Sequence, residues 1–151
     1  MPLTDLRTQP TAALIRTVII SYGDGHHDAP RGSALLVDAR PLRNPPQDPA
    51  VRERMLRATG LDPHIRDYVK ASPGADRLIE RSFRRSLALL ALSDHHRVDV
   101  HVLCGGGRHR SVVVAEELAM RLIAVGYGVE TEHRHIDRPI LDTLGDRTHN
   151  P

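Results

Sequence analysis

Short apolar runs alternate along the chain with amphipathic stretches of helical period. Runs rich in β-branched residues predict buried strands over 16–22, 33–38, 98–103 and 129–136. Helices are predicted over 50–58, 64–70, 76–92 and 111–125, the last two because apolar side chains recur at every third or fourth position. This alternation is typical of an α/β fold, and we predict a small, mostly parallel sheet with flanking helices.

The segments outside these elements suggest how the chain is divided. Four prolines fall within 41–49, which predicts a stiff, extended connection. The first dozen residues mix Thr, Pro and Gln without a period, and the residues after 136 are rich in turn formers. We therefore predict a single α/β domain over 13–136, with a flexible N-terminal tail over 1–12 and a C-terminal tail over 137–151.

Composition narrows the function classes. Of the 151 residues, 40% are hydrophobic and 26% are charged, as in a folded globular protein. Aromatic residues make up 3%, which argues against stacking of nucleic-acid bases. Lys70 is the only lysine among 21 basic residues, so the remainder are arginines. Guanidinium groups suit phosphate and carboxylate ligands, although a GC-rich genome explains the same bias.

The cysteine and histidine residues limit which cell compartment and which metal sites we expect. A single cysteine, Cys104, excludes an internal disulfide, and no run of transmembrane length or leader pattern occurs, so we expect a cytoplasmic protein without a membrane partner. His133 and His135 would share one face of the last predicted strand. Because there is no HExxH pattern and no second thiolate, we predict no metal and no cofactor, and we interpret His26 and His27 as solvated loop residues.

The segment 104–111, CGGGRHRS, carries the strongest functional signal. An apolar strand leads into three glycines and then into a helix, whose first turn has backbone N–H groups without internal acceptors. Glycine allows these groups to close around an anion, and Arg108, Arg110 and Ser111 add charge and a hydroxyl donor. We predict a glycine-rich phosphate loop between strand and helix.

Asp38 and Arg40 stand at or just past the end of the second predicted strand, where open α/β sheets place ligand groups. Two interpretations stay open for them. Either they contact the ligand, or they form a structural ion pair at the end of the strand.

The spacing Cys-x-x-Gly-x-x-Arg-Ser also resembles the phosphate loop of cysteine-dependent phosphatases. That resemblance aligns Cys104 with the nucleophile and Arg110 with the phosphate-binding arginine. Leu103 stands where those enzymes usually have histidine, and the only candidates for the general acid are Asp94 and Asp99. We therefore favour a small buried residue as the interpretation of Cys104, and the enzyme is the alternative.

An ordered set of segments resembles the C-terminal domain of the RapZ (YvcJ-type) RNase adapter proteins. The set covers most of the chain from Tyr22 to His135 and consists of 38–45 (DARPLRNP), 59–62 (TGLD), 104–112 (CGGGRHRSV) and His133-Arg134. The resemblance implies a domain that binds an amino-sugar phosphate such as glucosamine-6-phosphate and contacts RNA and an RNase.

The roles that accompany this resemblance fall on the residues already singled out. Gly105, Gly106 and Gly107 would offer backbone N–H groups, Arg110 and Ser111 would hold the phosphate, and Arg108 would steer or clamp it. His109 would donate to the phosphate or cover the helix start. Asp38 would accept hydrogen bonds from sugar hydroxyls or an ammonium, and Arg40 would contact the phosphate or orient Asp38.

The chain departs from the family at three places. The pattern G-x-x-x-x-G-K-[ST] of the family's N-terminal ATPase does not occur, which predicts no nucleotide hydrolysis. The tail 137–151 contains three Asp and two Arg, whereas the resemblance implies a Lys/Arg-rich tail that contacts RNA. Pro46 stands near a position where the family has histidine.

The leading hypothesis is a non-enzymatic phosphosugar-sensing domain that passes its state to a protein or RNA partner and forms a homo-oligomer. A cysteine-dependent phosphatase is the alternative, and a constitutive RNA-binding adapter is a third class. The basic face of the helix over 76–92, with Arg77, Arg81, Arg84 and Arg85, is interpreted as solvated rather than as an RNA-binding stripe.

Overall fold

The computed structural model describes residues 14–43, 49–93 and 96–139. Its elements are β1 (Ile15–Gly23), the short 3-10 helix η2 (Asp24–His26), β2 (Leu35–Asp38), α2 (Pro49–Arg57), α3 (Pro63–Lys70), α4 (Ala75–Ser93), β3 (Val98–Cys104), α5 (Arg110–Ala124) and β4 (Gly128–His133). Every predicted strand and helix is present, with ends that differ by a few residues. The tail predicted over 1–12 lies outside the described residues, as do 140–151 of the C-terminal tail and Pro46.

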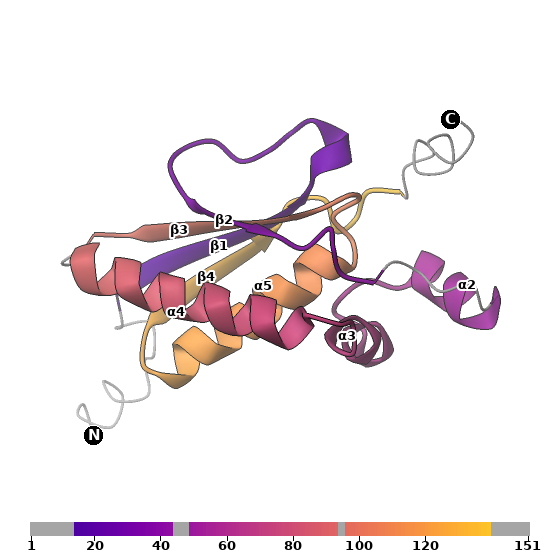
Figure 1. The fold of residues 1–151 in the computed structure, drawn as a ribbon. Coiled ribbons are helices and arrows are strands. Elements are labelled where there is room, and N and C mark those ends of the chain that lie inside the picture. Colours follow the sequence, from indigo (N-terminus) through magenta and orange to yellow (C-terminus); the bar gives the residue numbers. More distant parts are fainter. Residues whose placement is uncertain (1–13, 44–48, 94–95, 140–151) are drawn as a thin grey trace, which may run out of the picture.

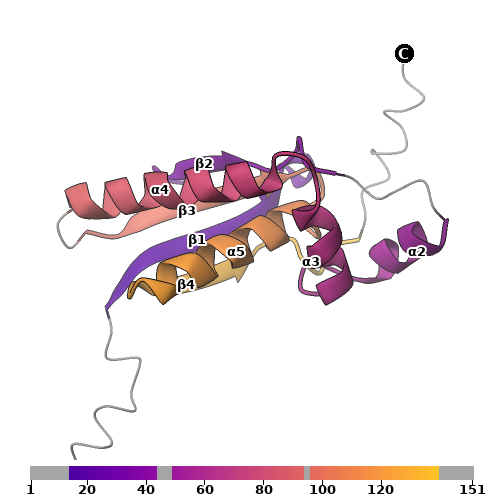
Figure 2. The same ribbon diagram turned by 60° about the horizontal axis from the view of Figure 1, so that its bottom comes forward.

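The strands form one parallel sheet in the order β2-β3-β1-β4 within the described part of the chain. Helices α4 and α5 both lie on one face of this sheet (Figures 1 and 2). The predicted α/β class with a mostly parallel sheet is thereby confirmed. The register aligns Tyr22 of β1 and Asp38 of β2 with the same residue of β3, Leu103, so the polar ends of β1 and β2 lie on either side of the end of β3.

The connection from β1 to β2 crosses the face that the helices leave open. Two parallel strands can be joined only if the chain returns from the end of the first to the start of the second. Residues 24–34 make this return as a loop that arches over the outer face (Figure 1). The chain therefore leaves β1 toward one face and leaves β3 toward the other, which is the arrangement where open α/β sheets bind ligands.

The last strand is shorter than predicted. It ends at His133, and residues 134–137 form a turn instead of continuing to 136. The Arg134 N–H still donates to Ser21 O (2.9 Å), after which Arg138 N–H closes back on His135 O (3.0 Å). The prediction that His133 and His135 share a strand face is therefore wrong. Among the described residues, no group of three metal-binding side chains comes together.

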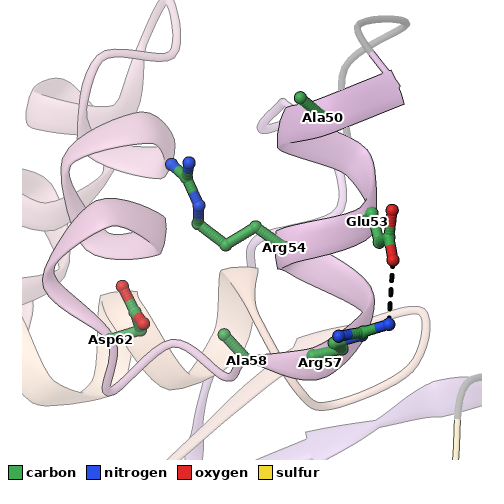
Figure 3. Close-up of a pocket in the computed structure, with 6 residues that line it drawn as sticks. All are labelled: Ala50, Glu53, Arg54, Arg57, Ala58 and Asp62. Atoms are coloured by element: carbon green, nitrogen blue, oxygen red, sulfur yellow. Dashed lines mark hydrogen bonds and ion pairs between the residues drawn. The ribbon is translucent and has the colours of Figure 1, made fainter.

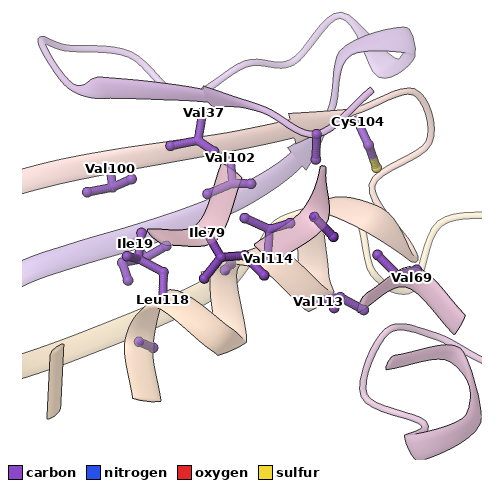
Figure 4. Close-up of a cluster of buried hydrophobic side chains, with 14 of the residues drawn as sticks. Ile19, Val37, Val69, Ile79, Val100, Val102, Cys104, Val113, Val114 and Leu118 are labelled. Carbon is purple, nitrogen blue, oxygen red and sulfur yellow. The ribbon is translucent and has the colours of Figure 1, made fainter. Parts of the chain in front are cut away.

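Apolar side chains between the sheet and its helices form the core (Figure 4). Ile19, Val100 and Val102 point from the strands toward Ile79 of α4 and Leu118 of α5, and all five are fully buried. Burial of this kind is the main favourable contribution to folding. No helix in the described ranges is long and apolar enough to cross a membrane.

Replacement of Leu118 by alanine should therefore destabilise the protein by about 2–5 kcal/mol, because the side chain is fully buried and leaves a cavity. Ile123→Ala on the same helix provides the control, since that side chain is 55% exposed. The control should change stability by less than about 1 kcal/mol. Urea unfolding monitored by circular dichroism measures both, and equal losses would contradict the packing described.

Candidate functional site

Residues 105–109 join β3 to α5, and three carbonyl groups of this loop are bound from outside it. Gly105 O accepts from the Gly25 N–H (3.0 Å) and Gly106 O from Nε2 of His26 (3.1 Å). Arg108 O accepts from the Gly60 N–H (2.7 Å). The donors come from the loop after β1 and from the connection between α2 and α3, so two distant segments hold the same short loop.

These outward carbonyls determine where the next N–H groups point. In a trans peptide the C=O and the following N–H are antiparallel, and the described residues contain no cis peptide. The N–H groups of Gly106, Gly107 and His109 therefore face the inside of the loop. Gly107 donates to Sγ of Cys104 (3.3 Å), whereas the other two have no acceptor within the described part of the chain. Inward N–H groups at a helix start form a cradle suited to an anion.

The glycines of the loop have different reasons for being glycine. Gly107 has φ of 78°, and a Cβ there would lie 2.6 Å from Gly23 N and 2.9 Å from Cβ of His135. A Cβ on Gly23 would lie 2.4 Å from the carbonyl carbon of Gly106. By contrast, a Cβ on Gly106 would meet no atom within 4 Å. Gly107 is thus required by packing, and Gly106 borders open space.

Cys104 lies at the floor of the cradle and is 2% exposed. Its thiol donates to Oγ of Ser111 (3.1 Å), while the sulfur accepts the Gly107 N–H. Both neighbours could donate to a thiolate, as a nucleophilic cysteine requires. A general acid is harder to find, because Asp99 lies near the opposite end of β3, roughly 16 Å along the strand, and pairs with Arg97 (2.8 Å). Asp94 is outside the described residues.

Arg110 connects the cradle to the loop that follows β2. It is 8% exposed, and its Nη1 donates to Arg40 O (2.6 Å) and Leu42 O (3.4 Å). Burial lowers the pKa of Arg110, but a guanidinium remains cationic at neutral pH. Among the described residues, no acceptor contacts its Nε and Nη2. These N–H groups remain available to an anion.

The side chains of Arg108 and His109 bind carbonyl groups in the structure. The resemblance implied that Arg108 steers or clamps the phosphate and that His109 donates to it or covers the helix start. Nη2 of Arg108 donates to the carbonyls of Leu56 and Ala58 (both 3.4 Å), and Nη1 donates to Arg138 O (2.9 Å). Nε2 of His109 donates to Ala58 O (2.9 Å) and also contacts Met55 O. The last carbonyls of a helix lack internal partners and favour cations. Both side chains therefore fasten the end of α2 to the loop.

Burial is the main cause that lowers the pKa of His109, although its hydrogen bonds to Met55 and Ala58 act in the opposite direction. A neutral imidazole at neutral pH follows. Its Nε2 must then carry the proton, because both of its partners are carbonyl oxygens.

Asp38 and Arg40 form the ion pair that one interpretation of the sequence predicted. Nε and Nη2 of Arg40 donate to the two carboxylate oxygens at 2.9 and 2.8 Å, and Asp24 lies 3.7 Å from the same guanidinium. The hydrogen bond from Arg40 is the main cause that lowers the pKa of Asp38. The carboxylate is therefore ionised at neutral pH, and with an exposed fraction of 41% it can still accept hydrogen bonds from a ligand.

Tyr22 completes the polar mouth of the site. It is 6% exposed, and burial followed by the charge of Asp24 raises the pKa of its hydroxyl. The mouth thus combines two carboxylates and one guanidinium beside the backbone cradle and Arg110.

Several residues that build the cradle were not identified from the sequence. His26, which we interpreted as solvated, donates to Gly106 O, and Gly25 and Gly60 bind the neighbouring carbonyls. His135 accepts the Gly23 N–H at 2.8 Å. The only signal was that Gly60 falls within the TGLD segment of the RapZ resemblance, where it had no assigned role.

A separate hollow of about 490 Å³ lies between α2 and the start of α3 (Figure 3). Its charged lining faces solvent: Arg57 and Glu53 pair at 2.8 Å with exposed fractions of 80% and 64%. Arg54 extends from α2 toward α3 in the close-up. Charges this exposed are screened by water and bind anions weakly. The cradle is the better-formed site.

The chain matches the family model described as RapZ C-terminal domain over residues 15–137. A nucleotide-binding protein of Frankia casuarinae is 37% identical over 134 residues, covering 86% of this chain and 44% of that protein. One from Thermus thermophilus is 41% identical over 132 residues, with coverage of 83% and 44%. One from Kocuria rhizophila is 31% identical over 140 residues, with coverage of 90% and 44%. The chain therefore spans less than half the length of these relatives.

Gly107→Ala should destabilise the protein by at least about 2 kcal/mol, because the new Cβ would overlap Gly23 and the backbone would be held at positive φ. Gly106→Ala, one residue away, provides the matched control and should cost less than about 1 kcal/mol. Thermal and urea unfolding compare the two variants. If Gly107→Ala proves as stable as Gly106→Ala, the close approach of the two loops is not as described.

Proposed function

Since this chain belongs to the RapZ C-terminal domain family, we propose that it binds a phosphorylated small molecule, an amino-sugar phosphate of the glucosamine-6-phosphate type, as a regulatory rather than a catalytic domain. The observation that carries the proposal is the juxtaposition of the inward-facing N–H groups of residues 105–109 with the carboxylates of Asp24 and Asp38. A ligand with a phosphate at one end and an ammonium at the other matches both halves.

The phosphate half uses groups that are already oriented. The inward N–H groups of Gly106 and His109 have no acceptor among the described residues, and Arg110 presents a buried guanidinium whose Nε and Nη2 are not bound by any of them. Hydrogen bonds that involve a charged partner contribute roughly 1.5–3 kcal/mol each, more than those between neutral groups. Ser111 supports the floor of the cradle through its contact with Cys104.

The sugar half is supplied by the end of β2 and the turn after β1. Asp38 and Asp24 share Arg40, which leaves one negative charge in excess at the mouth. An ammonium would be attracted to this charge, whereas a neutral hydroxyl at the same ring position would gain less. The two carboxylates of Asp24 and Asp38 thus give a reason for the site to prefer an amino-sugar phosphate to the corresponding phosphosugar without an amino group.

The word nucleotide in the names of the relatives applies to proteins more than twice as long as the matched region. We assign that activity to the P-loop ATPase that the RapZ resemblance implies for the other part of those proteins. Among the described residues, Tyr22 is the only Phe, Tyr or Trp that we place at the site, and at 6% exposed it offers no stacking face of useful size for a base.

One observation favours the enzyme as a second candidate. Sγ of Cys104 receives the Gly107 N–H and touches Ser111, so a thiolate there would be stabilised. Two observations weigh against turnover. Cys104 is only 2% exposed, and Asp38, a carboxyl at the mouth of the site, is kept ionised by Arg40 and would be a poor proton donor. Binding without chemistry is the function that the geometry favours.

The regulatory output of the domain rests on the resemblance. We propose that the ligand-bound state is passed to a protein or RNA partner and that the chain self-associates. The arginines on the outer face of α4 are exposed, and Arg84 lies 4.0 Å from Glu80 of the same helix. That pairing favours a solvated surface, so any RNA contact is expected to fade at near-physiological salt.

Isothermal titration calorimetry with glucosamine-6-phosphate should detect binding that Arg110→Ala weakens by at least about tenfold, because a buried charge-assisted contact is lost. Arg54→Ala, in the hollow between α2 and α3, is the matched control and should bind within about twofold of the parent. Asp38→Asn should weaken glucosamine-6-phosphate more than glucose-6-phosphate if the carboxylate meets the ammonium.

The same proteins separate the competing outcomes. Absence of heat with any phosphosugar would contradict the binding proposal, provided that circular dichroism shows a folded protein. Hydrolysis of an aryl phosphate by the parent and not by Cys104→Ser would establish the phosphatase instead. Loss of binding in Arg54→Ala but not in Arg110→Ala would move the site to the hollow.

A further inference from the structure

His135 lies in the turn after β4, behind the glycine loop, and its side chain is fully buried. Its Nδ1 accepts the N–H of Gly23 at 2.8 Å. Its ring lies 4.5 Å from the ring of His26, which donates to Gly106 O and so orients the next N–H into the cradle. A buried side chain outside the ligand site thus supports both the strand end and the histidine that shape the loop.

We propose that His135 in its neutral form is a positioning residue for the phosphate loop, and that ligand affinity falls when His135 takes up a proton. This inference rests on the proposed function and concerns the regulation of the same site. His135 also packs directly behind Gly107, where an added Cβ would lie 2.9 Å from Cβ of His135. It acts on the loop through this contact, through Gly23 and through His26.

The direction of the hydrogen bond explains the effect of a proton. Because Nδ1 accepts from a backbone N–H, the proton of the neutral ring is on Nε2, which faces Asp28 at 3.4 Å. A second proton would have to enter at Nδ1 and would face the Gly23 N–H directly. The Gly23 N–H cannot move away from this proton easily, because the Gly23 backbone is packed against Gly106 and Gly107 with no room for even a Cβ.

The charges around the ring come from three segments. The loop after β1 contributes His26 and Asp28, and the turn itself contributes Arg134, which lies 3.9 Å from Asp28, and Arg138. The glycine loop contributes Arg108, whose guanidinium binds the carbonyls of Ile136 and Arg138 in the same turn. Asp28 is the one carboxylate that contacts the ring within the described residues, and it is shared with Arg134.

Burial is the main cause that lowers the pKa of His135; His26 and Arg138 act in the same direction, and Asp28 opposes them. The folded protein therefore takes up this proton at a lower pH than the unfolded chain, whose histidine has the ordinary value of 6.5. The stabilisation from the neutral ring is complete above that value and is lost as pH falls through the lower, folded pKa. The loop should keep its shape at neutral pH and lose it in acid.

His135→Asn tests this role, because the amide oxygen can accept the Gly23 N–H and does not take up a proton. Glucosamine-6-phosphate is titrated into both proteins at about pH 7.5 and at about one pH unit below the midpoint that NMR shows for the ring nitrogens of His135, and the ratio of their affinities is compared. Protonation of the ligand and of other histidines, such as His101 and His109, cancels in this ratio. We expect affinities within about twofold at the higher pH and a parent at least about fivefold weaker than the variant at the lower pH.

Amide NMR tests the same role without a ligand and without relying on the variant. In the parent, the resonances of Gly23, Gly106 and Gly107 should move on acidification with the midpoint shown by the ring nitrogens of His135. In folded His135→Asn this common movement should disappear. Different midpoints in the parent, or an affinity ratio that does not change with pH, would overturn the inference. If neither protein binds the phosphosugar, the proposed function fails, while the NMR midpoints still decide the positioning role.

Discussion

The outward hydrogen bonds of three loop carbonyls are the constraint on which the site depends. Gly25, His26 and Gly60 each donate to a carbonyl of residues 105–108, and the planarity of the peptide then directs the following N–H inward. A glycine loop alone would be free to adopt many conformations, and fixing it has an entropic cost. Here the cost is met during folding, so the cradle is formed before any ligand arrives.

The fold supplies these donors through two of its connections. The return from β1 to β2 has to cross the outer face of the parallel sheet, and its first residues pass directly beside the end of β3 (Figure 1). The connection from α2 to α3 brings Gly60 to the same place, and Arg108 and His109 fasten α2 there by binding its final carbonyls. The loop that we propose as the anion site is therefore also the point at which separate parts of the chain are joined.

Local pattern was sufficient to predict the helices and strands, the parallel sheet and a glycine loop between β3 and α5, because helical period, β-branched runs and glycine are all visible within a few residues. Local pattern was insufficient to predict contacts between residues that are distant in sequence. His26 and Gly106 are 80 residues apart, and His109 and Met55 are 54 apart, so no spacing rule connects them. The end of β4 was also mispredicted, because the predicted strand was extended to Ile136, whereas turn hydrogen bonds end β4 at His133.

The central claim is that the inward N–H groups of the loop form the anion site. The most direct test is an amide NMR titration of the parent protein with inorganic sulfate, which keeps the same charge over the accessible pH range. The account predicts that the largest shifts occur at Gly106, Gly107 and His109. Shifts centred on α2 and the start of α3, or no shifts in the loop at any sulfate concentration, would contradict it.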